Sequence, residues 1–134
     1  MDNKLNRIIA VAEKFALDAM GVIPTHPDSK NTPTKGGVYV IYHNSDGIIY
    51  VGKARNLKRR VHSDHISGEL KNTTSTFRRS VNSKYGIPFG DQMRKWIDDN
   101  CRFGILEVDD ADIRGVVESI LIATLRSDKL LNKP

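Results

Sequence analysis

Cysteine is nearly absent from this chain of 134 residues, which contains only Cys101. A single cysteine cannot form a disulfide within the chain, and no spacing of cysteine and histidine matches a structural zinc site. These absences exclude a disulfide-stabilised secreted domain and a zinc-binding module. They predict a protein of the reducing cytoplasm.

Long apolar runs are also missing. No stretch approaches the about 20 consecutive apolar residues that a membrane-spanning helix requires. Charged residues are spread along the N-terminal segment at Asp2, Lys4, Arg7, Glu13 and Lys14. The sequence therefore predicts neither a signal peptide nor a membrane anchor.

Acidic residues are fewer than basic ones, with 16 aspartates and glutamates against 21 lysines and arginines. Hydrophobic residues make up 39% of the chain and charged residues 28%, as is typical of one soluble globular domain. The net charge of +5 favours a polyanionic partner. Basic residues are concentrated between positions 53 and 79, and the predicted nucleic-acid contacts there are Arg55, Lys58, Arg59, Arg78 and Arg79.

The N-terminal segment, residues 1–20, has apolar residues at helical spacing, which predicts an amphipathic helix that ends near Gly21. Residues 21–36 contain three prolines and several small polar residues, which predict a linker. The helix has two interpretations. It either covers the domain's own sheet, or it contacts a second copy or another partner chain.

Two β-patterned runs, residues 37–42 and 48–51, flank a turn that ends in Asp46-Gly47, which predicts a hairpin. In this hairpin Tyr39 and Tyr50 point from the same face of the sheet. One register places Gly52 opposite Tyr39 and leaves space beside its ring.

The segment after the hairpin predicts a helix capped by Asn56, with Leu57 and Val61 facing inward. On another face of this helix, Arg60 and Asp64 are neighbours.

The remaining pattern predicts a short helix at 76–84, a helical turn at 93–98, a third strand at 102–108 and a final helix. Asp109 or Asp110 caps this final helix, whose apolar residues form a continuous stripe. The predicted fold is α/β of the α+β kind. It is a small, largely antiparallel three-stranded sheet flanked by helices, with an added N-terminal helix.

The order of these motifs resembles the GIY-YIG nucleases, which include homing endonucleases, some restriction enzymes and a domain of the bacterial excision-repair incision subunit. The tripeptides are Gly37-Val38-Tyr39 and Tyr50-Val51-Gly52, and the basic segment after them ends in Arg60. Glu118 and Asn132 are similar to the family's glutamate and asparagine. The resemblance covers residues 37–134.

This resemblance implies a DNA endonuclease that depends on one divalent cation, Mg²⁺ or Mn²⁺. Phosphodiester hydrolysis needs an activated water, cationic groups at the phosphate and neutralisation of the departing oxygen. The resemblance implies that Tyr39 and Tyr50 activate and position the water, and that Lys53 and Arg60 give electrostatic support. It implies that Glu118 binds the metal and that Asn132 has a placement role. With a single site we expect nicking of one strand.

One position departs from the family pattern. Many members have tyrosine or histidine four residues after the catalytic arginine, where this chain has Asp64. Asp64 could pair with Arg60, join Glu118 at the metal, or lie outside the site while His62 or His65 substitutes. We favour His65, because a small helix distortion could bring it round, and imidazole suits proton transfer near neutrality.

Other interpretations of the same residues remain open. Glu118 could form a surface ion pair with Arg114, and the tyrosines could be half-buried packing residues. The chain could be a catalytically weak or inactive nucleic-acid-binding module, a nuclease subunit of a larger complex, or an interaction protein without DNA. The sequence predicts no preferred DNA structure or recognition sequence.

Overall fold

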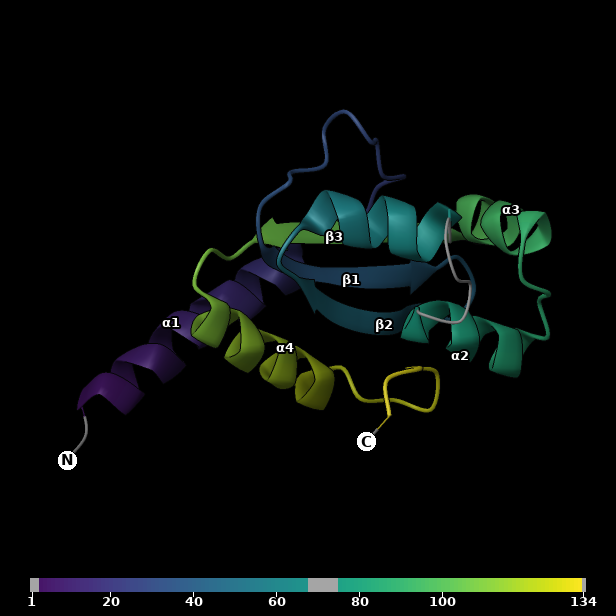
Figure 1. Ribbon diagram of the computed structural model, residues 1–134. Coiled ribbons are helices and arrows are strands. Elements are labelled where there is room, and N and C mark those ends of the chain that lie inside the picture. The colour runs from purple at the N-terminus through teal and green to yellow at the C-terminus, as the bar shows by residue number, and fades with distance from the viewer. Residues whose placement is uncertain (1–2, 68–74, 134) are drawn as a thin grey trace.

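The computed structural model describes residues 3–67 and 75–133, and its centre is a three-stranded antiparallel sheet (Figure 1). The strand order is β2-β1-β3, so both β2 and β3 are edge strands. The strands are β1 (Gly37–His43), β2 (Gly47–Ala54) and β3 (Cys101–Glu107). The predicted fold class is confirmed.

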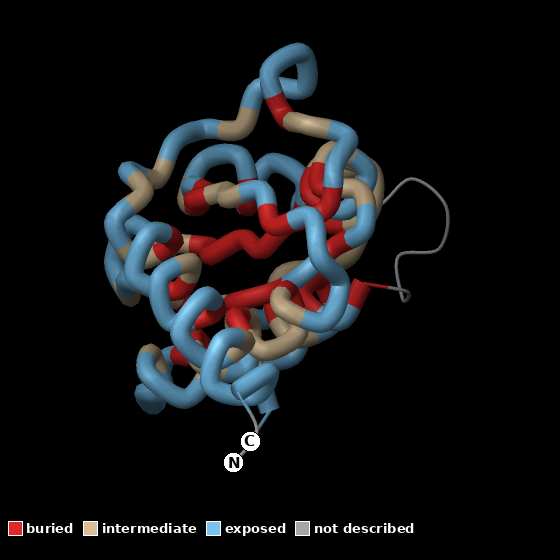
Figure 2. The backbone as a smooth tube through the Cα atoms, turned by 90° about the vertical axis from the view of Figure 1, so that its left-hand side faces the viewer, coloured by how far each residue is buried: buried red, intermediate tan, exposed pale blue. Residues whose placement is uncertain are grey.

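Helices cover both faces of the sheet. One face is covered by α1 (Asn3–Gly21) and α4 (Ala111–Thr124); the other by η1 (Arg59–Ser67), α2 (Thr76–Tyr85) and α3 (Asp91–Asn100). Alternate residues of β1 face opposite sides, so that Val38 and Val40 contact the first group while Tyr39 and Ile41 contact the second. Figure 2 accordingly shows buried backbone through the strands, with exposed segments outside.

The N-terminal helix packs on its own domain, as the first of its two interpretations predicts. Ala12, Ala16 and Ala19 are buried, and the helix contacts α4. The structure gives no support to the alternative of a dimer contact. No helix in the described part of the chain has the length and apolar character needed to cross a membrane.

The segment between α1 and β1 has little regular structure, yet it is hydrogen-bonded to the domain. Thr25 exchanges two backbone hydrogen bonds with Phe103 of β3. Further along, the Lys35 carbonyl accepts from the Leu57 amide at 2.9 Å. These bonds attach residues 22–36 to one edge of the sheet and to the start of η1.

The hairpin has the predicted register, with Tyr39 opposite Gly52 and Ile41 opposite Tyr50. The two tyrosines therefore share a face. The Tyr39 ring lies so close to Gly52 that a Cβ there would overlap its Cζ and Oη atoms. Glycine at this position is thus a requirement of the tyrosine ring rather than of the backbone.

The predicted helix after Asn56 forms, but it is wider than an α-helix. The Asn56 side chain accepts from the Arg59 amide at 3.0 Å, and Leu57 and Val61 are buried as predicted. From Arg59 to Ser67 the chain is a π-helix, whose hydrogen bonds span five residues instead of four. A residue five positions after a given residue therefore lies closer to that residue's face of the helix than it would in an α-helix.

The other elements differ from prediction mainly at their ends. The third strand begins one residue earlier, at Cys101, and α2 extends to Tyr85. The predicted turn at 93–98 is a complete helix, α3, which begins after Gly90. Asp110 caps α4, accepting hydrogen bonds from the amides of Asp112 and Ile113.

We expect Gly52→Ala to destabilise the protein by about 1–3 kcal/mol, because the methyl group would displace the Tyr39 ring. The measurement is the free energy of unfolding in urea. The control is Gly115→Ala in α4, where a Cβ would meet only Lys53 Nζ at an ordinary 3.5 Å. This control should be neutral or stabilising by up to about 1 kcal/mol. Equal stability of Gly52→Ala and the wild type would contradict the packing argument.

Candidate active site

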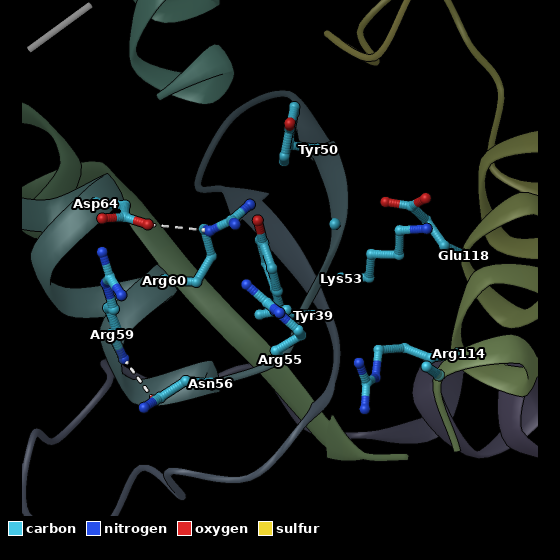
Figure 3. Close-up of a pocket in the computed structure, with 13 residues that line it drawn as sticks. Tyr39, Tyr50, Lys53, Arg55, Asn56, Arg59, Arg60, Asp64, Arg114 and Glu118 are labelled. Atoms are coloured by element: carbon cyan, nitrogen blue, oxygen red, sulfur yellow. Dashed lines mark hydrogen bonds and ion pairs between the residues drawn. The ribbon is translucent and has the colours of Figure 1, made fainter. Parts of the chain in front are cut away.

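A pocket of about 560 Å³ lies where β2, η1 and α4 meet (Figure 3). Tyr39, Tyr50 and η1 supply side chains from one face of the sheet, and Lys53 and α4 supply them from the other. Of the six predicted catalytic residues, the pocket is lined by Tyr39, Tyr50, Lys53, Arg60 and Glu118.

The two tyrosines form a stacked pair, with ring centroids 6.4 Å apart and an interplanar angle of 29°. Tyr39 is only 1% exposed, although its hydroxyl group points into the pocket (Figure 3). Burial raises the pKa of Tyr39 and of Tyr50 above the ordinary value, while Arg60 acts in the opposite direction. Both phenols are therefore protonated at neutral pH.

His65 contacts Tyr39 directly. Its Nε2 lies 2.5 Å from the Tyr39 hydroxyl oxygen, and its Nδ1 lies 2.7 Å from Oγ of Ser75. The π-helical turn makes this contact possible, because His65 follows Arg60 by five residues. His62, the other substitute considered, points elsewhere and lies 2.9 Å from the Thr32 hydroxyl.

The ionisation of His65 differs from expectation. Burial, and then the nearby Arg60 and Arg78 cations, lower the pKa of His65 to about 3. The imidazole is therefore neutral and a poor proton acceptor near pH 7. The expected proton transfer near neutrality does not fit this environment.

Asp64 occupies the first of its three predicted positions. Its Oδ2 accepts from Arg60 Nε at 3.1 Å, as the dashed line in Figure 3 marks. Both side chains are partly exposed, so water and salt weaken the pair. A phosphate can therefore replace the carboxylate at little cost.

Glu118 extends from α4 into the pocket, opposite Arg60. Burial raises its pKa, while Lys53 and Arg60 oppose that shift. Arg114 donates instead to the carbonyls of Val108 and Asp109, at 3.0 and 2.9 Å. The alternative of a surface ion pair between Glu118 and Arg114 is therefore wrong.

The chemistry of Glu118 fits a divalent cation. Mg²⁺ keeps several water molecules and takes one or two carboxylates together with substrate phosphates. In the described residues no group of three or more histidines, cysteines or carboxylates could enclose a metal ion. A cation here would be bound by Glu118, by water and by the phosphate of a substrate.

Asn132 lies outside the pocket and contacts the backbone of the edge strand β2. Its Oδ1 accepts from the Val51 amide and its Nδ2 donates to the Val51 carbonyl, both at 2.8 Å. The neighbouring Leu131 amide donates to the Ile49 carbonyl at 2.7 Å, and Leu130 is buried. Asn132 therefore contacts the backbone of Val51, the residue between Tyr50 and Gly52, and its placement near metal or phosphate stays a prediction.

The predicted DNA contacts separate into three groups. Arg55 and Arg59 line the pocket, and Lys58 and Arg79 lie outside it at least partly exposed. Arg78 is fully buried, and its Nη1 donates to the carbonyls of His65 and Ile66 at 2.8 and 2.9 Å. Its burial is at odds with a DNA contact.

Sequence reasoning did not find the partner of His65, which is Ser75. This serine precedes α2 and accepts a hydrogen bond from the Arg78 amide, as an N-cap does. Its place before a helical pattern was the available signal. The contact with His65 depends on the tertiary fold.

Comparison with known families identifies this arrangement. Residues 35–108, more than half of the chain, match the GIY-YIG catalytic domain. The chain belongs to the GIY-YIG family. By that membership it is an endonuclease of the phosphodiester-hydrolysing type. The match includes Tyr39, Tyr50, Lys53 and Arg60 but ends before Glu118, whose assignment depends on its place in the pocket.

Several curated relatives of this GIY-YIG protein are UvrABC system protein C from different organisms. That of Koribacter versatilis is 37% identical over 94 residues, or 63% of this chain and 15% of the relative. That of Prosthecochloris aestuarii is 48% identical over 54 residues, or 35% of this chain and 9% of the relative. The chain thus spans less than a sixth of the length of these relatives. No solved structure matches the chain significantly.

We expect the buried His65 to make the stability of the protein pH-dependent. The unfolded chain binds a proton near pH 6.5 and the folded protein near pH 3, so acidification between these values favours unfolding. One proton contributes up to about 1.4 kcal/mol per pH unit. Urea unfolding of the wild type and of His65→Gln between pH 4 and 7 should show a smaller slope for the variant. Identical slopes would contradict the neutral, buried imidazole.

Proposed function

We propose that this chain is a divalent-metal-dependent DNA endonuclease that makes single-strand nicks. The supporting observation is the convergence of a phenol, a guanidinium and a half-buried carboxylate, Tyr39, Arg60 and Glu118, on one pocket. Basic side chains at the pocket rim suit a polyanionic substrate, and we propose Arg55, Lys58 and Arg59 as backbone contacts. A cytoplasmic location stays a prediction.

Arg60 and Lys53 are the proposed phosphate ligands. A guanidinium presents a fork of donors to two phosphate oxygens. When the phosphate binds Arg60, it replaces the Asp64 carboxylate as the partner of this guanidinium. Lys53 extends from β2 over Gly115 of α4, on the Glu118 side of the pocket. The two cations would thus approach the phosphate from opposite sides as charge spreads over its oxygens in the transition state.

Tyr39 is the proposed base for the attacking water. The water oxygen forms a bond to phosphorus while the bond from phosphorus to the 3′ oxygen breaks. The water proton passes to the ionised Tyr39 oxygen, and the departing oxygen takes a proton from solvent. Burial keeps the ionised fraction of Tyr39 small, and Arg60 increases it. Tyr50, on the neighbouring strand β2, would position the water.

A cation held by Glu118, either Mg²⁺ or Mn²⁺, would supply positive charge to the phosphate and to the departing oxygen. Two carboxylates line the pocket, but Asp64 pairs with Arg60, which leaves Glu118 as the single proposed metal ligand of each chain. One incision per encounter is therefore the proposed outcome.

We expect Glu118→Gln to lower the rate of plasmid nicking by about 100-fold or more, because the amide binds a divalent cation poorly. The measurement is conversion of supercoiled plasmid to open circles with Mg²⁺ or Mn²⁺, and a chelator should abolish it. The control is Glu107→Gln at the end of β3, which should leave the rate unchanged. Nicking by Glu118→Gln at the wild-type rate would argue against the metal assignment.

We expect Arg60→Lys to lower the nicking rate by about 10- to 100-fold while binding to plasmid changes little. The lysine keeps the charge but loses the fork of donors. The matched control is Arg94→Lys, an exposed arginine of α3 that pairs with Asp91. Equal rates for Arg60→Lys and Arg94→Lys would mean that the fork is not used.

The second candidate is a domain that binds nucleic acid without cutting it, or that cuts only within a larger complex. The observation in its favour is the ion pair of Asp64 with Arg60, which partly neutralises the proposed phosphate ligand. Salt-dependent binding of DNA by the wild type without any nicking would support this candidate over the nuclease.

A further inference from the structure

Three buried side chains form a continuous hydrogen-bonded series beneath the pocket: Tyr39, His65 and Ser75. The series runs from the Tyr39 hydroxyl through both ring nitrogens of His65 to the Ser75 hydroxyl, with separations of 2.5 and 2.7 Å. Tyr39, His65 and Ser75 are 1%, 2% and 4% exposed. The direction of the two hydrogen bonds between them therefore depends on the protein rather than on bulk water.

The Ser75 end fixes that direction. Ser75 Oγ already accepts the Arg78 amide hydrogen as the N-cap of α2, at 3.2 Å. A hydroxyl group has one proton, and a buried proton of this kind needs an acceptor. Within the described residues, His65 Nδ1 is the acceptor that the structure places at this hydroxyl. Ser75 therefore donates to Nδ1, which is then the unprotonated ring nitrogen.

We infer that Ser75 holds His65 in the tautomer with its proton on Nε2. In this tautomer the Nε2–H group of His65 donates a hydrogen bond to the Tyr39 oxygen. The imidazole is thus a hydrogen-bond donor to the proposed base and not an acceptor of its proton. The hydrogen-bond direction follows from the geometry alone. Its catalytic consequence rests on the proposed nuclease function.

The opposite direction leaves the Ser75 proton without a partner in the described part of the chain. If Tyr39 donated to Nε2 and Nδ1–H donated to Ser75, the Ser75 proton would have no acceptor among the described residues. The Tyr39 proton, in contrast, does not need the His65 ring as its acceptor, because Tyr39 lines the pocket and its hydroxyl group points into it. The buried serine, not the tyrosine, therefore decides between the two tautomers.

The surroundings of His65 keep the ring singly protonated. Burial lowers its pKa, and two guanidinium groups, those of Arg60 and Arg78, disfavour a second proton. The choice is therefore between two neutral tautomers.

The consequence for Tyr39 is that its ionised form meets a donor on the buried side and Arg60 on the pocket side. A hydrogen bond donated to the charged oxygen favours ionisation, which is what a phenolic base requires. Ser75 never touches the substrate in this scheme. It is a positioning residue that acts through His65.

The decisive experiment determines the tautomer by long-range proton–nitrogen NMR of the nitrogen-15-labelled full chain at pH 7. The chain contains four histidines, and the His65 ring signals are those that disappear in His65→Gln. We expect the pattern of a neutral ring protonated at Nε2. A ring protonated at Nδ1, or a mixture of tautomers, would overturn the inference. This measurement does not depend on catalysis, so it stands whether or not the protein nicks DNA.

Two substitutions test the catalytic consequence. Ser75→Thr keeps both the cap and the hydroxyl proton, and should keep the tautomer and the nicking rate. Ser75→Asp keeps the cap but, when ionised, only accepts hydrogen bonds, so it should reverse the tautomer and lower kcat by about 10-fold or more. A reversed tautomer with full nicking would contradict the role of Ser75. If Ser75→Asp does not fold, the test compares kcat of Ser75→Thr with kcat of Ser75→Ala. We expect the higher kcat for Ser75→Thr, and equal kcat for these two variants would contradict the role of Ser75.

Discussion

The close contact between the Tyr39 ring and Gly52 is the constraint on which the site depends. Because glycine has no side chain, the ring can lie across the neighbouring strand and bring its hydroxyl group to the pocket. That position places the phenol between His65 on the buried side and Arg60 on the pocket side. A β-carbon at position 52 would therefore disturb the Tyr39 hydroxyl through packing alone.

The edge position of β2 explains how both faces of the sheet contribute to one pocket. The chain end pairs with β2 at Ile49 and Val51 through a backbone amide and the Asn132 side chain. This pairing covers the strand edge up to the residues that line the pocket, where Lys53 turns toward α4. Side chains from η1 and α4 can then line one pocket at this end of β2.

Sequence patterns predicted the parts of the fold that depend on local periodicity. The alternation of β1 and β2 placed Tyr39 and Tyr50 on one face, with Gly52 opposite Tyr39 in one of the possible registers. The apolar spacing of the first and last helices located both helices. The burial of Arg78 was not predictable, because an arginine in a basic segment is normally solvated. Its partners are carbonyls at the end of η1, which only the tertiary fold brings near. The partner of Asn132 could not be predicted for the same reason.

The π-helix resolves the departure at Asp64. In an α-helix the residue four positions after Arg60 shares its face, so one side chain would have to serve both as ion partner and as Tyr39 contact. The wider turn brings the fifth residue round as well, so Asp64 pairs with Arg60 near solvent while His65 reaches Tyr39 in the core. Arg78 and Ser75 support this turn from α2, through the His65 carbonyl and ring. Asp64 is therefore compatible with a side-chain partner for Tyr39, because His65 rather than Asp64 lies against the Tyr39 hydroxyl.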